Sequence, residues 1–182
     1  MLIKVIVIIG ILLLYLVRFR PSVIKRIFVN EVINYRVITP ELIILALVIL
    51  QLFGYTVGRL TDHQWLMYFG TCLFILGLFF SLYSRLVLGN EYMPALSTKA
   101  SGRLVTSGPF KIVRHPVYFG GLMGFLGLEL ALNSPLIFLI VVIFPLVVKQ
   151  INIEEKILLF EHSDEWGNYT KQTRFKLIPF VY

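Results

Sequence analysis

Long apolar runs dominate the chain, and their lengths constrain its fold more than any other feature. Five such runs occur, at Leu2–Val17, Leu42–Val57, Trp65–Tyr83, Val117–Leu132 and Leu136–Val148. A helix of about 20 apolar residues crosses the ~30 Å hydrocarbon core of a bilayer, so each run needs its flanking residues to complete a span. Hydrophobic residues make up 58% of the 182 residues, which exceeds the about 45–50% of soluble domains. The sequence therefore predicts an all-α integral membrane protein with about five transmembrane helices.

Prolines mark where some of these helices begin and bend. Thr39-Pro40 and Ser134-Pro135 each combine a capping side chain with a proline at the first helical position, which is typical of a helix start. Pro145 lies inside the fifth run, where its missing N–H removes a hydrogen bond to the carbonyl of Val141 and predicts a kink. Such a kink would splay the end of this helix and open a cleft.

Glycines at helical spacing predict close contact between helices. Gly54 and Gly58 form a GxxxG pair, and Gly120, Gly124 and Gly127 fall on one face of the fourth run. Small residues at this spacing let helix backbones approach closely in lipid. Both groups are therefore predicted to serve packing.

Basic residues beside the apolar runs give the chain a net charge of +7. They occur in residues 18–36, 85–114 and 149–176, with only Lys4 and Arg59 outside these segments. The positive-inside rule then places the N-terminus outside and the C-terminus in the cytoplasm. Cations in these positions serve as topology signals and contacts to anionic membrane lipid, so nucleic acid is not a predicted partner.

This orientation brings two distant polar segments to the same membrane face. The short Asn133-Ser134 connection faces outward and makes the last two helices an antiparallel hairpin. The Leu104–Tyr118 loop and the Glu154-Glu155 pair then both lie at the cytoplasmic face. The sequence therefore predicts a C-terminal helical hairpin with a pocket at its cytoplasmic end.

Two other places in the sequence carry charged residues that can lie at a membrane interface. Val23–Ile38 mixes apolar and charged residues and fits equally an interfacial amphipathic helix or a plain cytoplasmic loop. Glu129 lies near the outer end of the fourth run, about three turns or ~20 Å from His115 by helix rise. That distance is too large for a shared site, so Glu129 is predicted to reach the outer interface.

The cysteine content limits the chemistry. Cys72 is the only cysteine in the sequence and lies inside an apolar run. A disulfide framework and a cysteine–histidine zinc site are both excluded, and no metal is predicted.

Polar residues suited to chemistry gather at the predicted pocket. Arg114-His115-Pro116-x-Tyr118 combines a cation, an imidazole and a phenol at a helix start, whose free backbone amides attract anions. Arginine and tyrosine also favour the head-group zone, so an interfacial anchor is the alternative interpretation. Gln150 and Glu154 share a helix face, whereas Glu155 points about a quarter-turn away. One carboxylate is thus predicted to face the cleft and the other to face water, with a fully solvated helix face as the alternative.

The order and spacing of these motifs resemble a known family. The pattern begins with Leu104-Val105-x-x-Gly108-Pro109-Phe110-x-x-x-Arg114-His115-Pro116-x-Tyr118-x-Gly120 and continues after one hairpin with Glu154-Glu155-x-x-Leu158, Trp166-x-x-Tyr169 and Leu177-Ile178-Pro179. It looks like the isoprenylcysteine carboxyl methyltransferase family and is similar to the related phospholipid methyltransferases. The resemblance covers residues 70–182 as a methyltransferase-like core, and residues 1–60 match only as variable helices. Residues 1–182 are predicted to form a single integral membrane domain.

The resemblance implies an enzyme that transfers a methyl group from S-adenosyl-L-methionine to a small lipophilic acceptor at the cytoplasmic membrane face. Carried over by position, the cofactor-binding residues are Leu104, Val105, Phe110, His115, Pro116, Val117, Tyr118 and Glu154. Arg114 and Glu155 are the implied catalytic residues, and Gln150 is the implied substrate-binding residue.

Two positions depart from the pattern of the family. Ser81-Leu82-Tyr83-Ser84 stands where the family has an Arg-x-Trp-Ala-like stretch, and Gln150 stands where the prenylcysteine enzymes carry an arginine. An ionised carboxylate acceptor would lose its charge partner there unless Lys149 or Arg114 replaces it. The predicted acceptor is therefore another lipophilic nucleophile, such as a phenol, enol, thiol, amine or small acid.

Two other functions remain open on the sequence. Membrane reductases of the sterol or steroid type carry a similar Arg-His-Pro-x-Tyr-x-Gly motif and use NADPH, although they tend to be longer and lack this Glu-Glu hairpin. A non-catalytic membrane scaffold would keep the helices without using His115 or Glu154. Cofactor preference separates these functions.

Overall fold

The computed structural model describes residues 2–18, 35–55, 58–89 and 103–181, and its regular secondary structure in these segments is entirely helical. The elements are α1 (Leu2–Arg18), α3 (Tyr35–Leu52), α4 (Gln64–Leu88), η2 (Gly108–Lys111), α5 (Pro116–Ala131), η3 (Pro135–Leu139), α6 (Ile140–Glu161) and α7 (Ser163–Gln172). Most of Val23–Ile38, the predicted amphipathic helix or loop, lies outside the described residues.

Two stretches of the described chain are long and apolar enough to cross a membrane by length and composition. They are Gln64–Leu88 and Pro135–Glu161, and α1, α5 and Leu42–Leu52 are shorter apolar helices. Large apolar side chains point outward from these helices, as expected for surfaces in contact with lipid; Leu12, Phe79 and Val141 are examples. The all-helical class is confirmed for the described residues, whereas the five spans and their orientation stay predictions.

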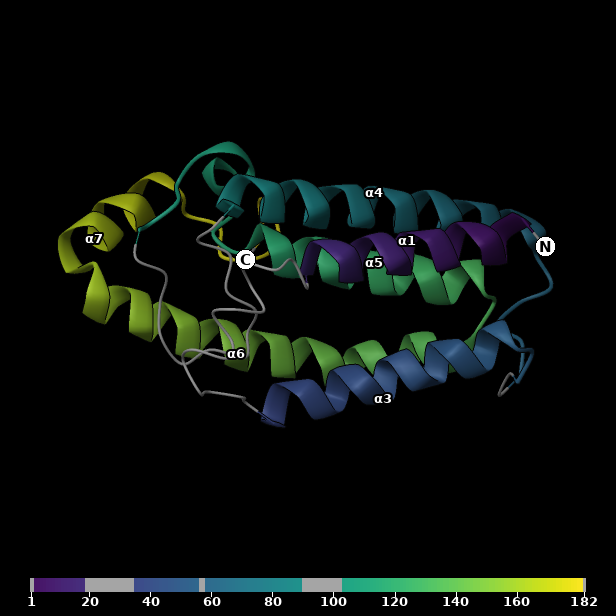
Figure 1. The fold of residues 1–182 in the computed structure, drawn as a ribbon. Coiled ribbons are helices and arrows are strands. Elements are labelled where there is room, and N and C mark those ends of the chain that lie inside the picture. The colour runs from purple at the N-terminus through teal and green to yellow at the C-terminus, as the bar shows by residue number, and fades with distance from the viewer. Residues whose placement is uncertain (1, 19–34, 56–57, 90–102, 182) are drawn as a thin grey trace.

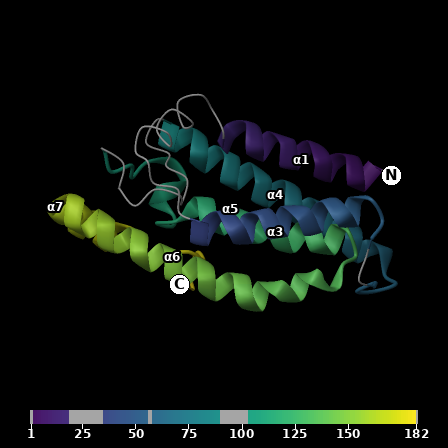
Figure 2. The ribbon, with the colours of Figure 1, turned by 60° about the horizontal axis from the view of Figure 1, so that its bottom comes forward.

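The long helices run side by side in one bundle, and α7 lies beyond the end of α6 (Figure 1). A second view shows the same arrangement, with α1 beginning at the end of the bundle opposite to α7 (Figure 2). An apolar cluster joins four helices through Val7 of α1, Val48 of α3, Phe74 of α4 and Leu128 of α5. We call the end of the bundle that carries α7 the site end.

The helices α4 and α5 approach so closely that their glycines leave no room for a side chain. A Cβ on Gly127 would lie 2.2 Å from the backbone nitrogen of Phe74, and one on Gly120 would lie 2.6 Å from that of Ser81. Ordinary contacts begin near 3.4 Å. The packing role predicted for the glycines of the fourth run is therefore confirmed at these two positions.

The boundaries of α3 differ from the prediction. The helix ends at Leu52, and Gly54 (φ +95°) and Gly58 (φ +142°) follow it with no atom within 4 Å of an added Cβ. The predicted GxxxG contact is wrong, because residues beyond a helix end share no helix face. The helix also begins at Tyr35, so the start predicted at Thr39-Pro40 is wrong as well.

The turn between α5 and η3 was predicted more accurately. Ser134 accepts a hydrogen bond from the backbone nitrogen of Leu136 at 3.1 Å, which is the expected cap before Pro135. Pro145 lies inside α6, as expected. The antiparallel α5–α6 hairpin is visible in Figure 1 and returns the chain to the site end.

Glu129 on α5 does not reach the outer interface, so that prediction is wrong. The residue is only 1% exposed, and its Oε1 accepts a hydrogen bond from Gln51 Nε2 at 3.4 Å. Gln51, itself 3% exposed, belongs to α3. The neighbouring helix α3 therefore supplies a polar partner for this carboxyl group, which lipid could not provide.

Candidate active site

The loop before α5 is fastened to α7 through one backbone carbonyl. The carbonyl oxygen of Phe110 accepts hydrogen bonds from Tyr169 Oη at 2.8 Å and from Thr173 Oγ1 at 3.2 Å. Burial raises the pKa of the Tyr169 phenol above its usual range, so the hydroxyl keeps its proton and donates. Trp166 belongs to the same buried apolar cluster as Phe110 and Tyr169. These contacts fix η2 relative to α7.

The segment after α7 returns to the start of α5. The backbone nitrogens of Arg114 and His115 donate to the carbonyls of Phe175 at 2.9 Å and Lys176 at 3.0 Å. Leu177 follows and is fully buried. The C-terminal segment thus satisfies two backbone amides beside the helix start and brings Lys176 next to α6.

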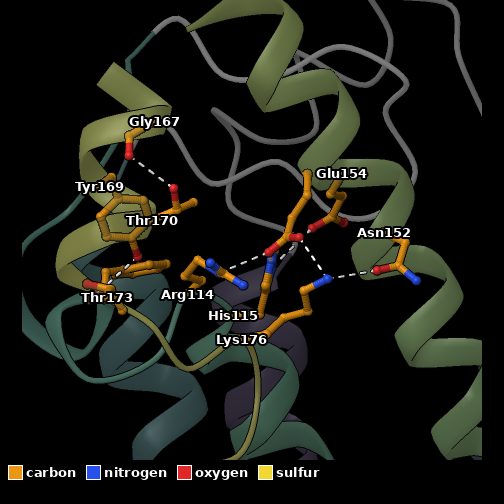
Figure 3. Close-up of polar contacts among 11 residues, drawn as sticks. Arg114, His115, Asn152, Glu154, Gly167, Tyr169, Thr170, Thr173 and Lys176 are labelled. Carbon is orange, nitrogen blue, oxygen red and sulfur yellow. Dashed lines mark hydrogen bonds and ion pairs between the residues drawn. The ribbon is translucent and has the colours of Figure 1, made fainter. Parts of the chain in front are cut away.

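Three basic groups enclose the carboxylate of Glu155. Its Oε1 lies 3.0 Å from Arg114 Nε and 3.2 Å from His115 Nε2, and its Oε2 lies 2.8 Å from Lys176 Nζ. Lys176 also donates to Asn152 Oδ1 at 2.9 Å, and Figure 3 shows it reaching across to α6. The Glu155 side chain is 17% exposed. The C-terminal segment covers this carboxylate, so the prediction that one of the two carboxylates faces water is wrong.

Glu154 points to a different set of partners. Its Oε1 accepts hydrogen bonds from the Tyr118 hydroxyl and, at 3.5 Å, from Gln150 Nε2. Its Oε2 lies 3.8 Å from His115 Nδ1. The imidazole of His115, only 6% exposed, therefore bridges the two adjacent carboxylates with one ring nitrogen toward each.

A cavity of about 470 Å³ extends from this cluster into the bundle. Arg114, His115, Tyr118 and Glu154 line its polar end, and mainly apolar side chains of α1, α3, α4 and α5 line the remainder. This volume lies within the about 300–1,000 Å³ typical of small-molecule sites. The cavity therefore joins a charged, aromatic end to an apolar interior.

The predicted site residues fall into two groups. The cavity lining contains Leu104, Val105, Phe110, Arg114, His115, Pro116, Val117, Tyr118 and Glu154. Gln150 and Glu155 are outside this lining and contact residues that belong to it. In the described part of the chain, no group of three potential metal ligands occurs.

Sequence reasoning missed several residues of the site. Lys176 and Thr173 carried no signal, because the contacts they make depend on the return of the C-terminal segment. Trp166 and Tyr169 stood in the motif without a role, and both line the cavity. Arg85 of α4 lines it too, and only its position on the cavity face of that helix could have indicated it.

Two individual proteins give a first comparison. Over 104 residues the chain is 32% identical to a Delta(14)-sterol reductase from Methylotuvimicrobium alcaliphilum, covering 54% of this chain and 24% of that protein. A solved structure of a eukaryotic intramembrane Ras methyltransferase, an isoprenylcysteine carboxyl methyltransferase, superposes with a TM-score of 0.63 at 26% identity. That match covers 82% of this chain and 55% of the other, so the chain spans about half the length of the solved relative.

A family model gives the second comparison. The model of the phospholipid methyltransferases matches residues 65–162, which is more than half of the chain. This stretch runs from the start of α4 to the end of α6 and contains both the loop before α5 and the glutamate pair. The motif resemblance, the matched segment and the shared fold agree, and the chain belongs to the phospholipid methyltransferase family.

Proposed function

We propose that this protein uses S-adenosyl-L-methionine to methylate a lipophilic acceptor at the cytoplasmic face of a membrane. The family supports methyl transfer at the membrane. The cavity is the observation that supports the choice of cofactor and of acceptor, because it joins a carboxylate and several aromatic rings to an apolar interior. A water-soluble donor and a lipid chain can meet in such a cavity because each finds its own kind of surface there.

The residues present fit this cofactor. S-adenosyl-L-methionine carries a sulfonium and an ammonium group, and both are stabilised by carboxylates and by the faces of aromatic rings. Glu154 lines the cavity together with Phe110, Trp166 and Tyr169. Tyr118 donates to the Glu154 carboxylate and holds it in position. Glu154 would thus hold a cationic part of the cofactor.

The two implied catalytic residues take different roles in this proposal. Arg114 lines the cavity and can contact a bound ligand directly. Glu155 is a positioning residue, because it pairs with Arg114 and His115 without lining the cavity itself. Glu155 fixes the orientation of the His115 ring, and the second nitrogen of that ring contacts Glu154 and so helps to position its carboxylate.

Methyl transfer is an in-line displacement at carbon and depends on alignment more than on acid–base groups. When bound, the cofactor supplies an electrophilic methyl group on a sulfonium sulfur. Glu154 and the aromatic side chains beside it would hold the donor, and the apolar lining of the cavity would hold the chain of the acceptor. The chain contributes by orienting the two reactants and by excluding water with the apolar walls of α4 and α5.

The proposed acceptor is a lipophilic nucleophile, such as a phenol, enol, thiol, amine or small acid. Its chain would occupy the apolar part of the cavity, near Phe74 and Leu128. We further propose five spans with the N-terminus outside, because the basic residues then fall on the cytoplasmic side. In this orientation the site end faces the cytoplasm, where the cofactor is dissolved.

Binding of S-adenosylhomocysteine to the detergent-purified protein, measured by calorimetry, tests the cofactor. We expect saturable binding, and we expect Glu154→Gln to weaken it by a charge-assisted contact of about 1.5–3 kcal/mol, or roughly 10- to 100-fold. Glu165→Gln is the matched control, because that carboxylate lies on α7, is 73% exposed and is outside the cavity lining. Wild-type affinity in the Glu154 variant would remove this carboxylate from the cofactor site.

The sequence similarity to a sterol reductase favours a second candidate, an NADPH-dependent reductase. The match covers only 24% of that enzyme, so its activity does not transfer to this chain as a whole. NADPH is therefore titrated in parallel with S-adenosylhomocysteine. Binding of NADPH alone would replace the methyltransferase proposal with the reductase, and binding of neither would favour a scaffold.

A further inference from the structure

Two buried polar side chains meet inside the bundle, at the end away from the site end. Gln51 of α3 and Glu129 of α5 are both almost fully buried, and Gln51 Nε2 donates to Glu129 Oε1 at 3.4 Å. Neither residue lines the cavity. The pair therefore has no part in the proposed reaction as described so far.

One oxygen of each side chain is left without a donor. Glu129 Oε2 and Gln51 Oε1 are buried, and no hydrogen-bond partner among the described residues reaches either of them. Ser134 interacts with the same carboxyl group from the turn that follows α5, and Oε2 still lacks a partner. A buried acceptor without a donor is costly. A single hydrogen atom on Glu129 Oε2 would satisfy both oxygens, because it would give Gln51 Oε1 a donor.

The helices around Glu129 offer no charge that compensates an ionised carboxylate. Within the described segments Glu129 forms no ion pair. It is the only charged residue of α5, and α4 has no charged residue between Gln64 and Ser84. The charged residues of α3 are Arg36 and Glu41, which precede Gln51 by about 15 Å or more of helix rise.

Two other elements bring charges to this end of the bundle and direct them elsewhere. Lys4 of α1 is exposed and donates to the carbonyl oxygen of Leu52 at 2.9 Å. The loop before α4 carries three exposed titratable residues, Arg59, Asp62 and His63. Burial of an ionised carboxylate without a cation is far more costly than burial of a neutral carboxylic acid. The surroundings of Glu129 therefore favour its neutral form.

The same pair joins a wall of the cavity to the rest of the bundle. α3 supplies Ile44, Leu45 and Val48 to the cavity lining. Gln51 follows Val48 by about one helical turn and so falls on the same face of α3. The contact of Gln51 with Glu129 thus influences where this wall stands relative to α5.

We propose that Glu129 is held as a neutral carboxylic acid, joined to the Gln51 amide by two hydrogen bonds, and that this pair positions α3 as a wall of the cavity. The Gln51 Nε2 amide donates to Glu129 Oε1, and the protonated Glu129 Oε2 donates to Gln51 Oε1. Ionisation of Glu129 removes the second donor, buries a charge and loosens the contact of α3 with α5. This inference goes beyond the proposed function and does not depend on which ligand the cavity binds.

Infrared spectroscopy of the full chain in neutral detergent tests the protonation of Glu129. A carboxylic acid has a C=O stretching band that a carboxylate lacks. We expect this band to be lost from the spectrum of Glu129→Gln at neutral pH. Glu165→Gln is the matched control, because that side chain is 73% exposed and should lose carboxylate bands instead. Loss of carboxylate bands in Glu129→Gln would overturn the proposal.

Thermal unfolding at a series of pH values tests the link between the proton and stability. An amide both donates and accepts, so Glu129→Gln keeps two hydrogen bonds and should melt close to the wild type at neutral pH. The native wild type binds a proton that the unfolded chain releases, so its Tm should fall relative to that of Glu129→Gln as the pH rises. A difference in Tm that does not change with pH would contradict the protonated pair.

Exchange of the two groups tests the pairing itself. Gln51→Met keeps the length of the side chain and leaves the Glu129 carboxyl group unpaired, so the Tm should fall by about 4–8 °C. The double variant Gln51→Glu with Glu129→Gln moves the acid to α3, rebuilds both hydrogen bonds and should melt close to the wild type. A double variant that melts well below the wild type would overturn the pairing, even if Gln51→Met does not fold.

Distances between spin labels, measured by pulsed electron resonance, test the position of α3. Cys72 of α4 is exposed and is the only cysteine of the sequence, and Ile43→Cys adds a second label at an exposed position of α3. We expect a narrow distance distribution at neutral pH that broadens at alkaline pH, and the same label pair with Glu129→Gln should stay narrow at both. A distribution that stays narrow without this substitution would overturn the role of the pair in positioning α3.

Discussion

Replacement of Gly127 by alanine should destabilise the bundle at the contact between α4 and α5. The added Cβ would lie 2.2 Å from the backbone nitrogen of Phe74 and 2.7 Å from the carbonyl carbon of Leu73, against 3.4–4 Å for ordinary contact. Both obstructing atoms belong to the α4 backbone, so no side chain can rotate away and the helices must separate. Overpacking of this kind costs about 1–3 kcal/mol, and a backbone obstruction places the cost toward the upper end.

Alanine also favours a helix over glycine by about 1 kcal/mol, so the net effect depends on which contribution is larger. Gly121 lies on the same helix, and a Cβ added there meets nothing within 4 Å. Gly121→Ala therefore isolates the contribution of helix propensity. The net cost of about 2 kcal/mol should lower the Tm of Gly127→Ala in detergent by about 4–8 °C, whereas Gly121→Ala should leave the Tm unchanged or slightly higher. A Gly127→Ala protein that melts at or above the wild type would refute the close contact of α4 with α5.

Two further substitutions probe the polar end of the cavity. Lys176→Met removes the 2.8 Å contact to Glu155 and keeps an apolar side chain of similar length. It should weaken S-adenosylhomocysteine binding several-fold, although Lys176 does not line the cavity. Unchanged affinity would show that Glu155 orients His115 without Lys176. Gln150→Arg should leave the preference between anionic and neutral acceptors unchanged, since Gln150 is outside the lining. A shift toward carboxylates, measured as binding of dodecanoate against uncharged dodecanol, would show that Gln150 faces the acceptor.

The meeting of the loop and the glutamate pair was predictable from the sequence. An apolar hairpin with a two-residue turn must return its far end to its starting face, and the contacts of Glu155 with Arg114 and His115 confirm this. The motif spacing identified the residues on each side. Helix periodicity also predicted that Gln150 and Glu154 share a face, which their hydrogen bond confirms.

Contacts that depend on helix placement were not predictable in the same way. The spacing of Gly54 and Gly58 matches that of Gly120 and Gly124, but only the latter pair lies within a helix. Which pair packs depends on where α3 ends, and local patterns fix helix ends poorly. Glu129 was misplaced for a related reason, because its burial depends on Gln51 of a helix 78 residues away in sequence.

The adjacent glutamates show how one helix can serve two purposes at the same site. Successive residues on an α-helix point about 100° apart, so Glu154 and Glu155 extend into different surroundings, although both reach His115. Glu154 lines the cavity, whereas Lys176 of the C-terminal segment contacts and covers Glu155. Because His115 contacts both carboxylates, any change that loosens the C-terminal segment also frees the ring that orients Glu154. The order of the proposed cofactor site therefore depends on residues that lie outside the cavity.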